Sequence, residues 1–230
     1  MAAGWLVGPL RPQPGLPVPV VCGRAAPDHP AGVRVRRGTL IVLAKAPALG
    51  RVKRRLARGL GEAQALRFYR TCLSGTLRRL GNDPRWRSVL AVAPDRATVA
   101  RHWPRGWTVV PQGGGDLGVR MLRQLQSAGG PAVLVGGDIP GITPALIARA
   151  LDALRYADAV FGPSDDGGYW LIGLARSPRR LDSLAGVRWS TEHALADSIR
   201  ALGLKTALVD RLADVDEAEG YRRWVRNRSD

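Results

Sequence analysis

The sequence predicts an α/β protein with an open, mostly parallel sheet covered by helices. Two observations carry this prediction. Short, wholly apolar runs rich in β-branched residues recur along the chain, and segments with helical spacing of apolar residues separate them. Such runs are typical of strands that are buried on both faces. The length of 230 residues suits one large domain, and a hydrophobic content of 45% is enough to form its core.

The expected strands and helices alternate from residue 39 onward. The strands are expected at residues 40–44, 89–93, 108–110, 132–135, 159–161, 169–174 and 206–209. Three helical faces are formed by Leu66, Tyr69, Leu73, Leu77 and Leu80, by Leu117, Met121, Leu122 and Leu125, and by Leu146, Ile147, Leu151 and Leu154. Thr143 is the expected N-cap of the third, with Pro144 in its first turn. Repeated βα units direct attention to residues just after strands, where ligands bind.

Residues 1–38 differ from the rest, because prolines are dense among glycines and no periodic apolar pattern is present. We expect a disordered extension here and one domain over residues 39–230. A start codon placed too far upstream would produce the same pattern. The extension lacks the basic cluster of a signal peptide, and the sequence has no run of about 18 apolar residues, so we expect no transmembrane helix and a cytoplasmic location.

The net charge of +16 does not by itself predict nucleic-acid binding. All the basic residues except Lys45, Lys53 and Lys205 are arginine, as a GC-rich coding sequence tends to produce. Signatures of RNA binding with interleaved aromatics are missing, so no nucleic-acid partner is expected; a basic cleft that attracts a phosphate-bearing ligand remains open.

Several kinds of chemistry find no support in the sequence. Cys22 and Cys72 cannot form a disulfide scaffold, and together with three scattered histidines they do not have the spacing of a zinc site. A G-x-S-x-G elbow of serine hydrolases is also missing. Any reaction must therefore use carboxylates, arginine, lysine and backbone amides.

The loop after the first strand is a candidate anion site. It contains Lys45, Gly50, Lys53 and Arg55 and leads into a helix, so unpaired N–H groups and several cations are expected to gather there. The glycine spacing and the ending of a Walker A loop are missing. The alternative is a helix with a solvated basic face.

A glycine-rich segment follows the third expected strand and opens a helix. Residues 113–118 satisfy G-x-G-x-x-G, and Asp138 lies 20 residues beyond Gly118, where a dinucleotide site needs an acid for the ribose. Pro140, close behind Asp138, argues against that site. Asp116 is either a ligand contact or the N-cap of the following helix.

Asp138 is also a candidate metal ligand. It ends an apolar strand after two glycines and has no capping role, because Thr143 caps the next helix. Such a carboxylate suits a divalent ion that also contacts phosphates. The second ligand can come from Asp214 or Asp216, which follow another strand; without Asp138, these two acids would be an ordinary acidic turn.

A third acidic segment, residues 165–170, lies between two strands and contains Asp166 followed by two glycines and two aromatics. Asp-Gly favours a hairpin turn. A carboxylate beside aromatic faces can also orient a sugar hydroxyl or act as a base.

With these residues in place, the sequence resembles a bacterial family of GT-A-type, nucleotide-diphospho-sugar transferase-like proteins, formerly a domain of unknown function, some of which are described as glycosyltransferases of arsenosugar biosynthesis. The resemblance extends from about Gly38 to Tyr221. Its motifs are Ala44-Lys45-Ala46-Pro47 with Gly50, Val52-Lys53 and Arg55-Leu56; Gln112-Gly113 with Gly115-Asp116-Leu117-Gly118 and Arg120-Met121; Gly137-Asp138 with Pro140-Gly141; Gly162-Pro163 with Asp166-Gly167-Gly168-Tyr169 and Leu171-Ile172-Gly173-Leu174; Trp189-Ser190-Thr191; and Asp214-Val215-Asp216. The family usually has threonine where this chain has Arg54 and Glu217.

The resemblance implies a single-domain GT-A, Rossmann-like fold with a nucleotide site. Its implied nucleotide or substrate contacts are Lys45, Gly50, Lys53, Arg55, Gly115, Asp116, Arg120, Gly167 and Gly168. Asp138 and Asp216 would hold Mg²⁺ or Mn²⁺, and Asp166 is the candidate catalytic residue. The leading hypothesis is a glycosyltransferase that takes a sugar from a nucleotide sugar donor to a small-molecule acceptor. The alternatives are a nucleotidyltransferase similar to phospholactate guanylyltransferases, a non-catalytic nucleotide-binding protein and an NAD-binding protein.

Overall fold

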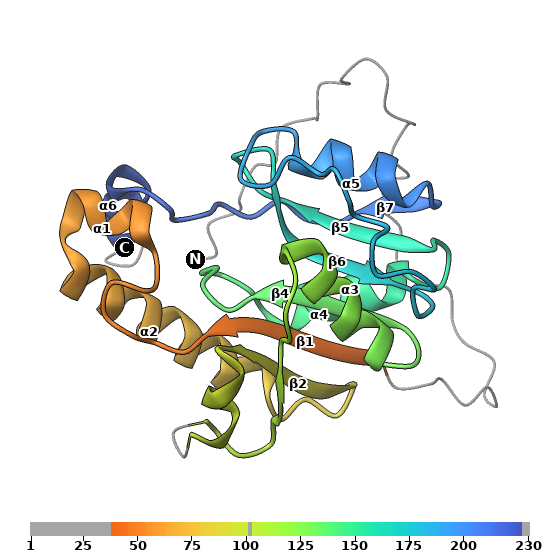
Figure 1. Cartoon of the computed structure of the whole chain (residues 1–230), viewed down its shortest axis with the longest axis horizontal. Coiled ribbons are helices and arrows are strands. Elements are labelled where there is room, and N and C mark those ends of the chain that lie inside the picture. The colour runs from red at the N-terminus through yellow and green to blue at the C-terminus, as the bar shows by residue number, and fades with distance from the viewer. Residues whose placement is uncertain (1–37, 101–102, 227–230) are drawn as a thin grey trace, which may run out of the picture.

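A computed structural model describes residues 38–100 and 103–226 (Figure 1). One seven-stranded sheet has the strand order β3-β2-β1-β4-β6-β5-β7. The strands are β1 (Gly38–Lys45), β2 (Trp86–Ala93), β3 (Thr108–Pro111), β4 (Ala132–Gly136), β5 (Ala159–Pro163), β6 (Tyr169–Leu174) and β7 (Thr206–Leu208). The α-helices are α1 (Arg54–Leu60), α2 (Glu62–Leu80), α3 (Leu117–Ser127), α4 (Pro144–Ala153), α5 (Ala194–Leu202) and α6 (Ala218–Arg226), and a 3-10 helix, η1, covers Asp95–Val99.

Helices cover both faces of the sheet. Successive residues of a strand point to opposite faces, so Leu40 of β1 packs with Leu73 of α2 and Ile147 of α4. The next residue, Ile41, packs on the other face with Leu122 of α3. The inner strands are largely apolar because helices cover both of their faces.

Every strand except β6 runs in the same direction. β1 pairs in parallel with β2 and β4, β2 with β3, and β5 with β7, whereas β6 is antiparallel to both β4 and β5. The carboxyl ends of six strands and the start of β6 therefore meet at one edge, which we call the C-terminal edge. Loops that leave this edge are the natural place for a ligand.

A smaller core joins the end of the described chain to its beginning. Leu56 of α1, Phe68 of α2 and Val215 are buried together. The Phe68 ring makes edge-to-face contacts with Tyr221 and Trp224 of α6, at centroid distances of 5.6 and 5.0 Å. Figure 1 shows α6, in blue, beside α1, in orange. This packing brings the segment between β7 and α6 back to the loop that precedes α1.

The structure confirms the α/β class, the seven expected strands and the three expected helices. Thr143 caps α4 as predicted, since its Oγ1 accepts a hydrogen bond from the Leu146 N–H. Helix α5 was not among the predicted elements. Apart from Gly38, which already belongs to β1, the predicted extension lies outside the described residues. Among the helices that the structure describes, none combines the length and the apolar character that crossing a bilayer requires.

Candidate functional site

The loop after β1 is fixed at its start by the side chain of Tyr69. The Tyr69 hydroxyl donates to the Lys45 carbonyl oxygen and accepts from the Lys45 N–H, both at 2.8 Å. Burial raises the pKa of Tyr69 above its ordinary value, and the nearby charge of Asp138 adds to the shift, so the hydroxyl stays protonated. Gly50 adopts a φ of 69° in this loop, a conformation that glycine adopts without strain.

Lys53, the last residue before α1, carries its ammonium into a group of three aspartates. Its side chain is only 3% exposed. Nζ lies 2.7 Å from Asp216 Oδ1, 3.1 Å from Asp138 Oδ2 and 3.4 Å from Asp214 Oδ1. The backbone of Lys53 is left-handed, with φ 45° and ψ 51°, which is uncommon for a residue with a side chain. We call these four residues the Lys53 cluster.

Burial and charge act against each other in the Lys53 cluster. Burial alone would lower the pKa of the Lys53 ammonium, but the three carboxylates outweigh it and raise that pKa above its ordinary value. Burial also raises the pKa of Asp214 to about 6; Lys53 opposes this shift, whereas Asp216 and Asp138 add to it. Lys53 is therefore firmly charged, and Asp214 ionises less readily than an ordinary aspartate.

The metal prediction for Asp138 and Asp216 is not tested by these contacts. In residues 38–100 and 103–226, no group of three or more acidic, histidine or cysteine side chains is arranged to hold a metal ion. Both aspartates nevertheless contact one point, which the Lys53 ammonium occupies.

Gln112, which is 2% exposed, ties the glycine-rich segment to the end of β1. Its Nε2 donates to the carbonyl oxygens of Ala44 and Ala91, and its Oε1 accepts from Arg120 Nη1 at 2.9 Å. Asp116 is the N-cap of α3, because its Oδ1 accepts from the Val119 N–H at 2.8 Å. Asp116 and Arg120 thus have local structural roles.

The strand order argues against the dinucleotide interpretation. Gly113 follows β3 and Asp138 follows β4, and these strands are separated by β2 and β1. Three strand spacings of about 4.8 Å place the two strand ends roughly 14 Å apart. A dinucleotide fingerprint needs its glycines and its acid on adjacent strands.

The turn between β5 and β6 holds Asp166. The Asp166 Oδ1 accepts from Ser164 Oγ at 2.7 Å and from the Gly168 N–H at 3.0 Å. Gly167, with a φ of 82°, accepts from the Leu195 N–H at 3.1 Å and so ties the turn to α5. The predicted hairpin turn is present, and the turn is also what positions the carboxylate.

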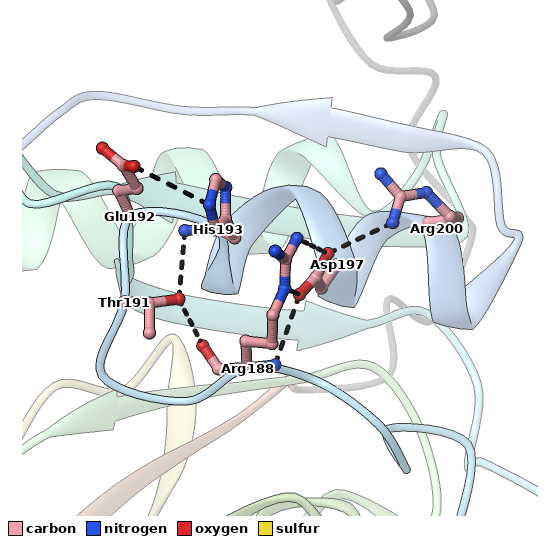
Figure 2. Close-up of polar contacts among 6 residues, drawn as sticks. All are labelled: Arg188, Thr191, Glu192, His193, Asp197 and Arg200. Carbon is pink, nitrogen blue, oxygen red and sulfur yellow. Dashed lines mark hydrogen bonds and ion pairs between the residues drawn. The ribbon is translucent and has the colours of Figure 1, made fainter.

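The loop before α5 is held by an ion pair between Arg188 and Asp197 (Figure 2). Asp197 is 7% exposed and accepts from Nε and Nη2 of Arg188 at 2.8 and 3.0 Å, and from Arg200 at 3.1 Å. Thr191 Oγ1 donates to the Arg188 carbonyl oxygen at 2.7 Å. Between them, Ser190 has a φ of 60°, so the loop has a strained backbone as well as a fixed shape.

These loops enclose a cavity of about 300 Å³ at the C-terminal edge. Its polar lining consists of Asp138, Ser164, Asp166, Ser190, Thr191 and Asp214, and its aromatic lining of Tyr169, Trp170 and Trp189. Asp138 and Asp214 belong to both the cavity and the Lys53 cluster. The site therefore has a charged part and an aromatic part in direct continuity.

The structure brings together some of the predicted site residues. Asp138, Asp166 and Gly168 line the cavity, and Lys53 and Asp216 join it through Asp138. In the described part of the chain, the cavity lining does not include the other predicted binding residues, which are Lys45, Gly50, Arg55, Gly115, Asp116, Arg120 and Gly167.

Sequence reasoning did not assign a role to several residues of the cavity. Trp189, Ser190 and Thr191 were quoted only as a motif, and Asp214 only as an alternative to Asp216. Ser164 gave no signal, because its contact with Asp166 depends on the turn geometry. The motif at 189–191 could have located Trp189, whereas Tyr169 and Trp170, the other aromatic residues of the lining, belong to the acidic segment at 165–170 that the sequence analysis did single out.

Comparison with solved structures shows a fold shared with nucleotide-diphospho-sugar and nucleotidyl transferases. A protein from Desulfovibrio desulfuricans G20, provisionally described as a nucleotide-diphospho-sugar transferase, is 27% identical over 85% of this chain and 89% of its own, with a TM-score of 0.76. A nucleotidyl transferase from Methanothermobacter thermautotrophicus is 15% identical over 85% of this chain and 100% of its own, with a TM-score of 0.54. The 4-diphosphocytidyl-2C-methyl-D-erythritol synthase of Anaerococcus prevotii is 11% identical over 84% and 98%, with a TM-score of 0.51.

The chain belongs to the family described as "Uncharacterized protein conserved in bacteria (DUF2064)", whose model matches residues 76–191. The matched range contains Asp138, Asp166 and Trp189, whereas Lys53 and Asp216 lie outside it. A search of curated proteins gives no significant match. The family and the fold confirm the resemblance that the sequence motifs indicated.

Proposed function

We propose that the protein is a glycosyltransferase that moves a sugar from a nucleotide diphosphate donor to a small-molecule acceptor, with Mg²⁺ or Mn²⁺ as cofactor. The observation that supports this most is that a charged cluster and an aromatic cavity share Asp138 and Asp214. A nucleotide sugar also has two parts: a diphosphate, which a divalent ion held by these carboxylates would contact, and a hydroxyl-rich ring, which suits the aromatic cavity.

The diphosphate is assigned to the loop between β1 and α1. Lys45 and Arg55 are exposed at its two ends, and Gly50 lets the chain turn between them. Cations in such a loop attract and orient a phosphate group and stabilise the charge that it gains as it departs.

The cofactor is assigned to Asp138 and Asp216. Their carboxylate oxygens are the donors that Mg²⁺ and Mn²⁺ prefer, and both already contact one cationic group at 3.1 and 2.7 Å. When bound, such an ion supplies Lewis-acid stabilisation of the departing diphosphate.

The sugar and the acceptor hydroxyl are assigned to the cavity. Trp189 and Tyr169 offer aromatic faces for the apolar side of a sugar ring. Both turn hydrogen bonds to Asp166 end on Oδ1, so we assign Oδ2 to the acceptor. The acceptor oxygen forms a bond to the anomeric carbon, and the bond from that carbon to the diphosphate oxygen breaks. The electron pair leaves with the diphosphate, and Asp166 takes the hydroxyl proton.

The test is a panel of nucleotide sugars and candidate acceptors with the full chain and Mn²⁺. We expect release of a nucleoside diphosphate together with a glycosylated product, measured by mass spectrometry. Asp166→Asn is expected to lower kcat at least 100-fold with little change in KM, because it removes the base. Asp182→Asn, an equivalent change in an exposed ion pair, is the control. Donor consumption by Asp166→Asn at the unaltered rate would contradict the assignment.

Nucleotidyl transfer is the second candidate, because the chain also shares its fold with nucleotidyl transferases. Incubation with nucleoside triphosphates would then release pyrophosphate instead of a nucleoside diphosphate. Nucleotide binding without any product would identify a binding protein.

A further inference from the structure

The Lys53 cluster contains more negative than positive charge. Three carboxylates surround one ammonium, so the cluster carries a formal excess of two negative charges when all three are ionised. Lys53 is the central member, because it contacts every carboxylate while its own side chain is 3% exposed. A divalent cation would bring the charge of these carboxylates closer to balance than one ammonium does.

The backbone of Lys53 indicates that these contacts determine its conformation. A residue with a side chain adopts a left-handed conformation at a cost in free energy, and such strain persists where the surroundings fix it. The surroundings here are Asp138 after β4, and Asp214 and Asp216 between β7 and α6. Lys53 therefore connects three segments of the C-terminal edge through its ammonium.

We propose that Lys53 is the resting counter-ion of Asp138, Asp214 and Asp216, and that it leaves these carboxylates when a divalent cation binds to two of them, Asp138 and Asp216. An ammonium and a divalent cation repel each other and cannot share the same carboxylate oxygens at close range. This inference rests on the proposed function for the identity of the ion. It adds that Lys53 has two positions, one on the carboxylates and one released from them.

Release of Lys53 couples the binding of two ligands, the divalent cation and a phosphate group. Once it has left the carboxylates, the ammonium is free to meet the phosphates that we assign to the same loop. A divalent cation alone must displace Lys53 without that compensation, so it binds weakly, and a phosphate ligand that accepts the ammonium strengthens its binding.

Chemical modification of lysine tests the release directly, because the whole chain has only Lys45, Lys53 and Lys205. Reductive methylation of the full chain, followed by mass spectrometry, reports each lysine separately. In EDTA we expect the exposed Lys45 and Lys205 to react rapidly and Lys53 to be protected at least tenfold. Mn²⁺ should remove the protection of Lys53 and leave the other two rates unchanged, whereas NaCl at the same ionic strength should not.

Metal affinity supplies the second measurement. Lys53→Met removes the competing ammonium and should bind Mn²⁺ alone at least tenfold more tightly than the unaltered chain, measured by electron paramagnetic resonance. Arg54→Met removes one positive charge from the next residue, whose side chain is exposed, and should change the affinity less than threefold. If Lys53→Met does not fold, Lys53→Gly serves, because glycine adopts the left-handed conformation without strain.

The modification experiment would overturn the proposal if Lys53 reacted as fast as Lys45 in EDTA, or if it stayed protected at saturating Mn²⁺. The affinity experiment would overturn it if Mn²⁺ bound equally well with and without the Lys53 side chain. Absence of Mn²⁺ binding in all variants would overturn it as well. None of these measurements depends on product formation. Sugar transfer by a protein whose Lys53 is never released would refute the exchange alone, and exchange without sugar transfer would refute only the glycosyltransferase assignment.

Discussion

A contact between Arg188 and Asp197 ties the loop that contains Trp189 to helix α5. The guanidinium and the backbone N–H of Arg188 both donate hydrogen bonds to the Asp197 carboxylate. Asp197 is 7% exposed, so its carboxylate depends on these donors in place of water. The position of Trp189, one of the aromatic residues of the cavity lining, is thus set by a contact that lies outside that lining.

Replacing Asp197 by Asn should lower the melting temperature by several degrees, because the Arg188 guanidinium loses its charged partner. Differential scanning fluorimetry at pH 7.5 is the measurement. Asp182→Asn, in an ion pair whose side chains are 76% and 59% exposed, should leave the melting temperature unchanged. An equal loss in both variants would show that the contact with Arg188 does not stabilise the loop.

Acid should weaken the same contact. Hydrogen bonds from Arg188 hold the pKa of Asp197 well below its ordinary value of 3.8. Because the pKa is lower in the folded state, the carboxylate stabilises the fold above about pH 4, and this contribution is lost as the pH falls further. The difference in melting temperature between the unaltered chain and Asp197→Asn should therefore shrink below pH 4, and a difference that grew there would contradict the sign.

Gly167→Ala should disrupt the turn that holds Asp166. Its φ of 82° is unfavourable for alanine, and a β-carbon would overlap the backbone of Glu192. Gly129 separates the cost of the backbone conformation from the cost of the overlap, because it has a φ of 71° but open space around it. Gly129→Ala should cost about 1 kcal/mol of unfolding free energy, and Gly167→Ala clearly more, as measured by urea denaturation. Equal costs would show that the turn can move away from Glu192.

Trp189→Ala should weaken binding of the sugar and spare the nucleotide. If Trp189 stacks on the sugar ring, the variant should bind the nucleotide sugar identified in the activity screen at least tenfold more weakly. Its affinity for the matching nucleoside diphosphate should change less than threefold, measured by isothermal titration calorimetry. Equal losses for both ligands would place Trp189 against the nucleotide.

Gln112→Met should destabilise the C-terminal edge beneath the glycine-rich segment. The amide serves two buried carbonyl oxygens, of Ala44 and Ala91, which the variant leaves without that donor. We expect a loss of about 2 kcal/mol in urea denaturation, the usual cost of a buried unsatisfied group. Gln126→Met, on the exposed surface of α3, should cost little. A similar cost for both would contradict the anchoring role.

The sequence was informative where structure depends on neighbours along the chain. The strands were predictable because wholly apolar runs are needed between two helical layers. Thr143 and Asp116 were predictable as caps because the contact lies three residues away. Asp138 was singled out because it follows a strand and has no local role.

The candidate site was less predictable because its contacts join distant segments. Lys53 and Asp216 are 163 residues apart, and they meet because α6 packs on α1 and α2. Nothing near Lys53 in the sequence indicates that its ammonium is buried among carboxylates. The position of Trp189 depends likewise on an ion pair between Arg188 and Asp197, which are nine residues apart in the sequence.

The return of the chain from β7 to α1 has a consequence for synthesis on the ribosome. Lys53 and Asp138 emerge long before Asp214 and Asp216, so a nascent chain holds the lysine with only one of its three acidic partners. The Lys53 cluster is thus completed last, after the sheet that supports it, and a protein shortened before Asp214 would keep all seven strands while lacking two of the three carboxylates that contact Lys53.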